Sequence, residues 1–178
     1  MTVRPRAALE PPVTLSIGNP SGLTAALACR TIQARRKRIP LNLDYSHLRK
    51  SIARLAANLA LARDAEAEGG PLFAALRDGT IQSFEFAYTM SIRALDRTVA
   101  DRVGAQELET AAFRDRLRMA WEAGLLPSVD IWLDFRHLRN ETSHTYDEAK
   151  ATKVYAAIPS FLDAAREVLE TLESKRAH

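Results

Sequence analysis

A fixed cation, an imidazole and a phenol lie within eight residues of one another in the last quarter of the chain. They are Arg139, His144 and Tyr146, and Asn140 directly follows the arginine. Arginine is charged at every working pH and presents a planar fork of donors that suits a phosphate. Histidine gives or takes a proton near neutral pH. This pattern therefore indicates chemistry on a phosphate ester.

These groups suit cleavage of RNA without a metal ion, in which the ribose 2′-OH attacks the adjacent phosphate. His144 would act as general base or acid, and Arg139 would stabilise charge on the phosphoryl oxygens. Asn140 would orient the phosphate or the imidazole. Cleavage needs both a base and an acid, so one histidine per chain favours a two-fold dimer. The simpler alternative is a surface arginine paired with Asp134 or Glu141, and a histidine bonded to the backbone of its loop.

A corner in the chain is needed to bring the two catalytic candidates together. Five residues turn an α-helix by about 140°, which would place Arg139 and His144 on different faces of one helix. The residues from Thr145 to Glu148 form a capping-box pattern, with Thr145 as the cap and Glu148 reaching back to it. A new helix is therefore expected after His144. Arg139 and His144 can then face one cleft, beside a helix N-terminus that favours anions.

Helical periodicity runs through the chain from about Asp44 to Lys175, and no strand pattern appears. In the first helix, for example, Leu48, Ile52, Leu55 and Leu59 recur at gaps of four and three residues. Both tryptophans, Trp121 and Trp132, are expected in the core. The spacing predicts an all-α fold, an antiparallel, up-and-down bundle of four to five helices with short connections. The expected helices span about 44–68, 72–103, 109–123 and 146–175, and a further helix starts at Ser128 and ends before Thr145.

Charge and composition divide the chain into two parts. Residues 1–43 hold seven basic residues and one acidic residue, and four prolines lie within the first 20 positions. We expect this part to be a basic extension that is largely disordered. The remainder has 18 basic and 21 acidic residues, so charge alone does not favour nucleic-acid binding by the bundle, which is expected over 44–175.

Other classes of protein are disfavoured by what the sequence contains. A single cysteine excludes a disulfide framework and a cysteine-based zinc site, and the four histidines lack metal-ligand spacing. We therefore expect neither a bound metal nor a cofactor. No apolar run approaches the length of a membrane span, and no signal peptide of the usual form is present. A cytoplasmic protein that does not contact membranes is expected.

Four stretches carry a resemblance to a known family. They are RNETSHTYDE at 139–148, IQSFEFAYTMSIRAL at 81–95, AWEAGLL at 120–126 and VYAAIPSFL at 154–162. In this order they resemble HEPN-domain proteins, specifically the HepT-like branch, also called nucleotidyltransferase substrate-binding proteins. The resemblance covers roughly residues 43–172. The sequence departs from the family at Thr89, where the family has an acid, so no role of that acid is carried over.

The resemblance implies partners as well as a fold. It implies a homodimer with the arginine–histidine motif at its interface. It also implies a toxin–antitoxin pair, in which an MNT-type nucleotidyltransferase transfers AMP onto Tyr146. The added bulk and negative charge beside Arg139 would block an RNA phosphate. The alternative is a non-catalytic, substrate-binding subunit of a two-component nucleotidyltransferase, which would bind a nucleotide or another anion in the same cleft.

Overall fold

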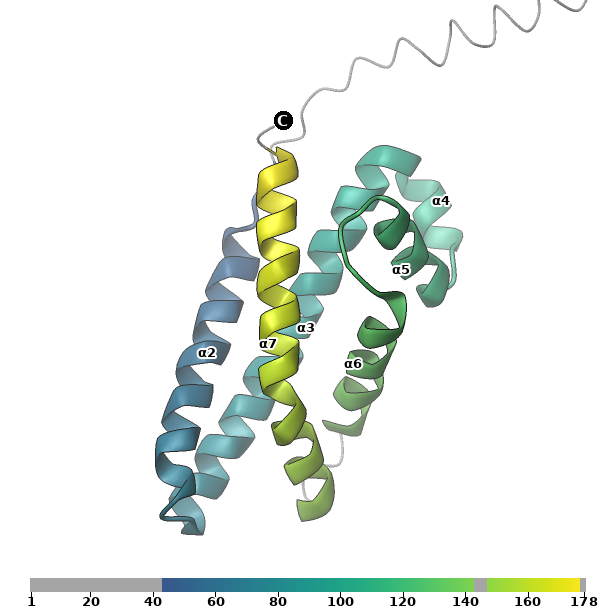
Figure 1. Ribbon diagram of the computed structural model, residues 1–178. Helices are drawn as coiled ribbons and strands as arrows, with labels where there is room; N and C mark the ends of the chain where they lie inside the picture. Colours follow the sequence, from purple (N-terminus) through teal and green to yellow (C-terminus); the bar gives the residue numbers. More distant parts are fainter. Residues whose placement is uncertain (1–42, 143–146, 177–178) are drawn as a thin grey trace, which may run out of the picture. The chain divides into compact units, whose positions relative to one another are not determined.

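The computed structural model describes residues 43–142 and 147–176 (Figure 1). Within these ranges the chain forms six α-helices and no strand, which confirms the all-α prediction. The predicted basic extension lies outside the described residues, apart from its last residue, Leu43. The helices are α2 (Ser46–Glu66), α3 (Gly70–Val103), α4 (Ala105–Thr110), α5 (Phe113–Glu122), α6 (Val129–Glu141) and α7 (Glu148–Arg176).

The four longer helices form an up-and-down bundle. Figure 1 shows α2, α3, α6 and α7 alternating in direction along the chain, with α4 and α5 between α3 and α6 at one end. The tight turn from α2 to α3 uses Gly69 and Gly70, whose φ angles of 64° and 74° lie in the left-handed region that favours glycine. None of the described helices is long and apolar enough to cross a membrane.

An aromatic cluster joins α3, α6 and α7 in the core. The ring of Phe161 in α7 packs edge-to-face on Phe84 of α3 at 4.9 Å and on Phe135 of α6 at 5.2 Å between centroids. Trp132 lies 6.1 Å from the same ring and is fully buried. Edge-to-face pairs of this kind stabilise a core beyond the area they bury. The cluster thus fixes α6, which carries Arg139, against α3 and α7.

The predicted helix over 109–123 is wrong in its extent, because the chain breaks there into α4 and α5. Ala111 and Ala112 have extended ψ angles of 140° and 154°. The preceding Thr110 hydroxyl hydrogen-bonds to the carbonyls of Gln106 and Glu107, at 3.2 and 3.1 Å. Such local side-chain bonds compete with continuation of a helix.

The prediction that both tryptophans belong to the core is half right. Trp132 is buried, but Trp121 is 51% exposed. The buried residues of α5 are Leu117 and Ala120. Trp121 follows Ala120 directly, and one residue turns a helix by about 100°, so the indole points away from the face that α5 buries.

Candidate functional site

Arg139 and Asn140 lie near the end of α6 with exposed side chains. Both line a hollow of about 320 Å³, together with Tyr88, Thr89, Ile92, Arg93, Phe113 and Arg136. Arg139 also lines a neighbouring hollow of about 480 Å³, whose other lining residues all come from α3: Gln82, Glu85, Phe86, Thr89, Met90 and Arg93. We call these two hollows together the α3–α6 face. It holds two of the predicted site residues side by side.

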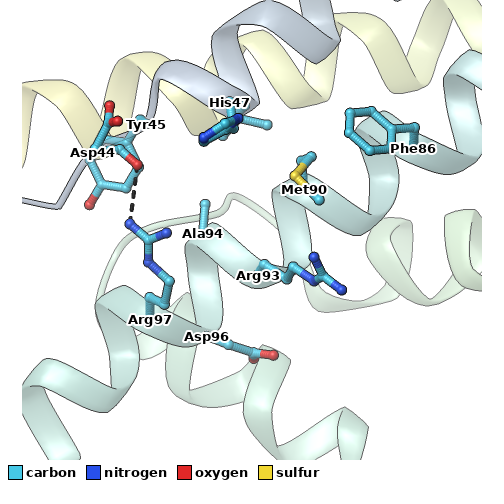
Figure 2. A pocket seen from close by; sticks show the side chains of 10 residues that line it. Asp44, Tyr45, His47, Phe86, Met90, Arg93, Ala94, Asp96 and Arg97 are labelled. Atoms are coloured by element: carbon cyan, nitrogen blue, oxygen red, sulfur yellow. Dashed lines mark hydrogen bonds between the residues drawn. The ribbon is translucent and has the colours of Figure 1, made fainter.

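Arg93 links the α3–α6 face to a third hollow. This hollow, of about 530 Å³, lies between the start of α2 and the middle of α3, and Phe86, Met90 and Arg93 belong to its lining (Figure 2). Its other cation on α3, Arg97, is engaged in a 3.1 Å hydrogen bond to the backbone carbonyl of Asp44. Arg93 therefore lines all three hollows, and its guanidinium is available to an anion bound beside it.

Three guanidinium groups surround the hollow that contains Asn140. Arg136 lies over the ring of Phe113, 3.8 Å from its centroid, a cation–π contact that holds it in place. Among the described residues, neither Arg93 nor Arg139 forms an ion pair with a carboxylate. Glu141, a candidate partner of Arg139, instead pairs with a lysine of α7. This concentration of positive charge suits a phosphate.

Tyr88 forms one wall of the same hollow and carries no charge there. Burial raises the pKa of its phenol to about 12, although Arg136 and Arg139 act in the opposite direction. Its hydroxyl has no hydrogen-bond partner among the described residues. At neutral pH the phenol is therefore protonated and does not act as a base.

The last turn of α6 is attached to α3. Thr142, which follows the helix, is buried, and its hydroxyl contacts the carboxylate of Glu85. The same hydroxyl lies 2.6 Å from the backbone carbonyl oxygen of Arg139. The hydroxyl of Thr142 thus links the half-buried carboxylate of Glu85 to the backbone of Arg139. This link restricts movement of the arginine along α3.

The start of α7 differs from the predicted capping box. Asp147 is the cap, because its Oδ1 accepts hydrogen bonds from the backbone N–H groups of Ala149 and Lys150, at 3.1 and 3.4 Å. Thr145, the predicted cap and the expected partner of Glu148, lies outside the described residues. The carboxylate of Glu148 accepts two hydrogen bonds from Arg77 of α3, one of them at 3.0 Å, and this lowers the pKa of Glu148. The buried guanidinium is a stronger partner than a backbone N–H.

His144 and Tyr146 lie outside the described residues, as does Thr145. The expectation that His144 shares a cleft with Arg139 stays a prediction. The chain on either side of this stretch is attached to one helix, through Glu85 on one side and Arg77 on the other. Within the described ranges, no three His, Cys, Asp or Glu side chains are placed to hold a metal ion.

Arg93 and Arg136 are site residues that the sequence motifs did not identify. A signal was present for each of them. Gln82, Phe86, Thr89 and Arg93 recur at gaps of four, three and four residues, which places them on one side of α3. Arg136 lies one helical turn before Arg139.

Comparisons with known proteins agree with this fold. Residues 43–174 match the profile of a family described as "Nucleotidyltransferase substrate binding protein like". Over 101 residues the chain is 38% identical to "Probable ribonuclease HepT" of Haemophilus influenzae, covering 56% of this chain and 69% of the relative.

A solved structure from Haemophilus influenzae is also similar, and it is described as the fold of a substrate binding domain of a nucleotidyltransferase. It matches with a TM-score of 0.69 and 30% identity, covering 73% of this chain and 99% of the other. The family profile spans well over half of the present chain, and sequence and fold point the same way. The chain belongs to the HepT-like family of nucleotidyltransferase substrate-binding proteins.

Proposed function

We propose that this protein is a HEPN-type endoribonuclease that needs no metal ion, with Arg139 and His144 as its catalytic residues. The observation that carries the proposal is the cluster of Arg93, Arg136 and Arg139 around one hollow that Asn140 also lines. Such a cluster, in a bundle without an excess of basic residues, is suited to a phosphodiester. The HepT relative, named as a probable ribonuclease, agrees with it.

The reaction follows from the groups available. An imidazole removes the proton from the ribose 2′-OH, and the oxygen attacks the adjacent phosphorus. Arg139 stabilises the negative charge that develops on the phosphoryl oxygens, and Asn140 orients the phosphate. The bond to the 5′-oxygen breaks, and a second imidazole, protonated, gives that oxygen its proton. The products are a 2′,3′-cyclic phosphate and a free 5′-hydroxyl.

A homodimer supplies the second imidazole. His144 of a second copy would act as the acid while that of the first acts as the base. The side chain of Phe86 supports such a contact, because it is 54% exposed and lines the same hollow as Arg139. An exposed aromatic side chain next to a half-buried methionine, here Met90, is typical of a surface that binds another protein.

The first test is cleavage of RNA by the purified protein in the presence of a chelator, after light scattering has established a dimeric mass. We expect cleavage by the native protein, and a loss of about a hundredfold or more in His144→Ala and in Arg139→Ala. Arg63→Ala, exposed on α2, is the matched control and should keep full activity. A monomeric mass, or equal activity in all variants, contradicts the proposal.

Regulation by a partner enzyme is the second part of the proposal. An MNT-type nucleotidyltransferase, acting as antitoxin, would transfer AMP from ATP to Tyr146. The phenol oxygen bonds to the α-phosphorus, and pyrophosphate leaves with the phenol proton passing to solvent or to a base of the partner. The attached phosphate would place negative charge beside Arg139 and repel RNA. Both proteins would act in the cytoplasm.

Substitution of the acceptor tests this regulation. In Tyr146→Phe the partner should transfer no AMP, as read by intact mass, and cleavage by the variant should persist when the partner and ATP are present. The hydroxyl is the only group removed, so the fold should not change. Normal AMP incorporation into Tyr146→Phe would show that another residue is the acceptor.

A non-catalytic role is the second candidate. The similar solved structure is described as a substrate binding domain of a nucleotidyltransferase, and the α3–α6 face could hold a nucleotide in the same way. In that case unmodified protein cleaves no RNA, while Arg139→Ala weakens nucleotide binding and leaves the dimer intact.

A further inference from the structure

A separate hollow of about 340 Å³ lies where α5 meets the start of α6. Its lining on the α5 side is Arg114, Arg118 and Trp121, and on the other side the chain from Pro127 to Asp130. The spacing of four and three residues places the two arginines and the indole on one side of α5. Trp121 was expected in the core, and the site described above does not use it.

We propose that this hollow is a second RNA-binding site, in which a base of single-stranded RNA stacks on Trp121 while Arg114 and Arg118 contact the flanking phosphates. This inference rests on the proposed ribonuclease function, because it extends the path of the same substrate. Every base has a flat face, so stacking on an exposed aromatic ring binds single strands with little sequence preference. Arginines beside the ring supply the contacts to the backbone.

The side chains of the hollow are available for a ligand. Trp121 is half exposed, and its ring makes no aromatic pair within the described part of the chain. Arg114 pairs with Asp130 at 2.8 Å and Arg118 with Asp115 at 3.8 Å, but all four of these side chains are more than half exposed. Exposed ion pairs contribute little to stability, so a phosphate can replace the carboxylates.

The geometry allows one strand to contact both sites. Val129 lines this hollow, and Arg136 and Asn140 line the hollow of the α3–α6 face. Gaps of seven and four residues place these three positions on one side of α6. The rise of a helix puts Val129 and Arg139 about 15 Å apart along the axis. Phe113, the first residue of α5, lines the hollow of the α3–α6 face, with Arg136 over its ring.

The two tryptophans make this site directly measurable. They are the only tryptophans in the chain, and Trp132 is fully buried. We would titrate the full-length, inactive His144→Ala variant with a short single-stranded oligouridylate and follow tryptophan fluorescence. Saturable quenching is expected, and it should weaken as salt is added, because phosphate contacts release counterions. Trp132→Phe should retain the quenching, since Trp121 remains.

Affinity is then measured with labelled RNA, independently of the indole signal. Trp121→Ala should weaken binding by roughly five- to 150-fold, the loss of one stacked base, whereas Trp121→Phe should bind nearly as well as the parent. Replacing both Arg114 and Arg118 by Gln should weaken binding and flatten its salt dependence. Arg63→Gln, on α2, is the control for loss of a positive charge.

The outcomes separate this site from the proposed catalysis. Trp121-dependent binding without cleavage by the native protein supports this site and refutes the nuclease. Unchanged RNA affinity in Trp121→Ala overturns the inference, whether or not the native protein cleaves RNA. It is equally overturned if that variant loses binding only to the partner nucleotidyltransferase, because the hollow would then be a protein-docking surface.

Discussion

The two tryptophans of this protein occupy opposite kinds of environment on neighbouring helices. Trp132 of α6 lies within the aromatic cluster, close to Phe135 and Phe161, and is fully buried. Trp121 of α5 has half of its surface in contact with solvent and lies on the same side of its helix as two arginines. One residue type thus serves packing in one place and is available for binding in the other.

In this fold, the aromatic residues that stabilise the core are different from those that are exposed and available for binding. The apolar cluster of α3, α6 and α7 is closed to solvent, and it fixes the helix that carries Arg139. Two aromatic side chains outside it, Phe86 and Trp121, are more than half exposed, and each shares a hollow with arginine. A bundle can change such exposed positions at little cost in folding free energy, whereas a change in the cluster affects the position of every helix in it.

Replacing each tryptophan by alanine should give the largest difference in stability between the two regions. Trp132→Ala removes a fully buried indole and leaves a cavity, so it should lower the free energy of unfolding by about 3–5 kcal/mol. Trp121→Ala should change it by only about 0.5 kcal/mol, the usual range for surface substitutions. Urea unfolding followed by circular dichroism measures both, since that signal does not depend on the indoles.

A large loss of stability in Trp121→Ala would break this comparison. It would mean that the indole packs against something in solution, such as a second copy of the chain. Repeating the measurement at several protein concentrations identifies that case, because the stability of an associated form rises with protein concentration.

The same contrast explains which parts of the fold were predictable. The long helices were found because their buried residues recur at helical spacing, and the predicted bounds 44–68 and 72–103 lie close to the observed Ser46–Glu66 and Gly70–Val103. The break at Ala111 and Ala112 was missed because alanine favours a helix. Trp121 was misassigned because hydrophobicity was taken to mean burial, although many apolar side chains remain on the surface.

The candidate site was predictable only where it is local in sequence. Arg139 and Asn140 were identified by a motif, and the structure places both on one hollow. Arg93 joins them from α3, more than 40 residues away, and its position depends on how α3 and α6 pack. Glu148 was assigned to a cap because the pattern of four residues fits a capping box, and the buried guanidinium of Arg77 that binds it instead is distant in sequence.

Two ion pairs show the same difference between a buried and an exposed environment, with a smaller expected effect on stability. Glu148 and Asp130 are both acids in the first turn of a helix, and both have exposed side chains, at 76% and 80%. Their arginines differ, because the side chain of Arg77 is 5% exposed and that of Arg114 is 60% exposed. The helix-dipole contribution is therefore matched, and burial of the arginine is the variable.

Glu148→Gln should lower the melting temperature at neutral pH more than Asp130→Asn does, because it leaves a buried guanidinium with Asp78, at 3.4 and 3.3 Å, as its one remaining carboxylate partner among the described residues. Hydrogen bonds from Arg77 hold the pKa of Glu148 below its ordinary value of 4.5, so the carboxylate stabilises the fold above that pH. This stabilisation is lost as the pH falls through the lowered pKa. The difference in melting temperature between the native protein and Glu148→Gln should therefore be largest at neutral pH and disappear under acid conditions, as measured by thermal unfolding across that range.

Equal melting temperatures for Glu148→Gln and Asp130→Asn at neutral pH would mean that solvent screens Arg77 as effectively as Arg114, and that burial of the arginine adds nothing to the pair.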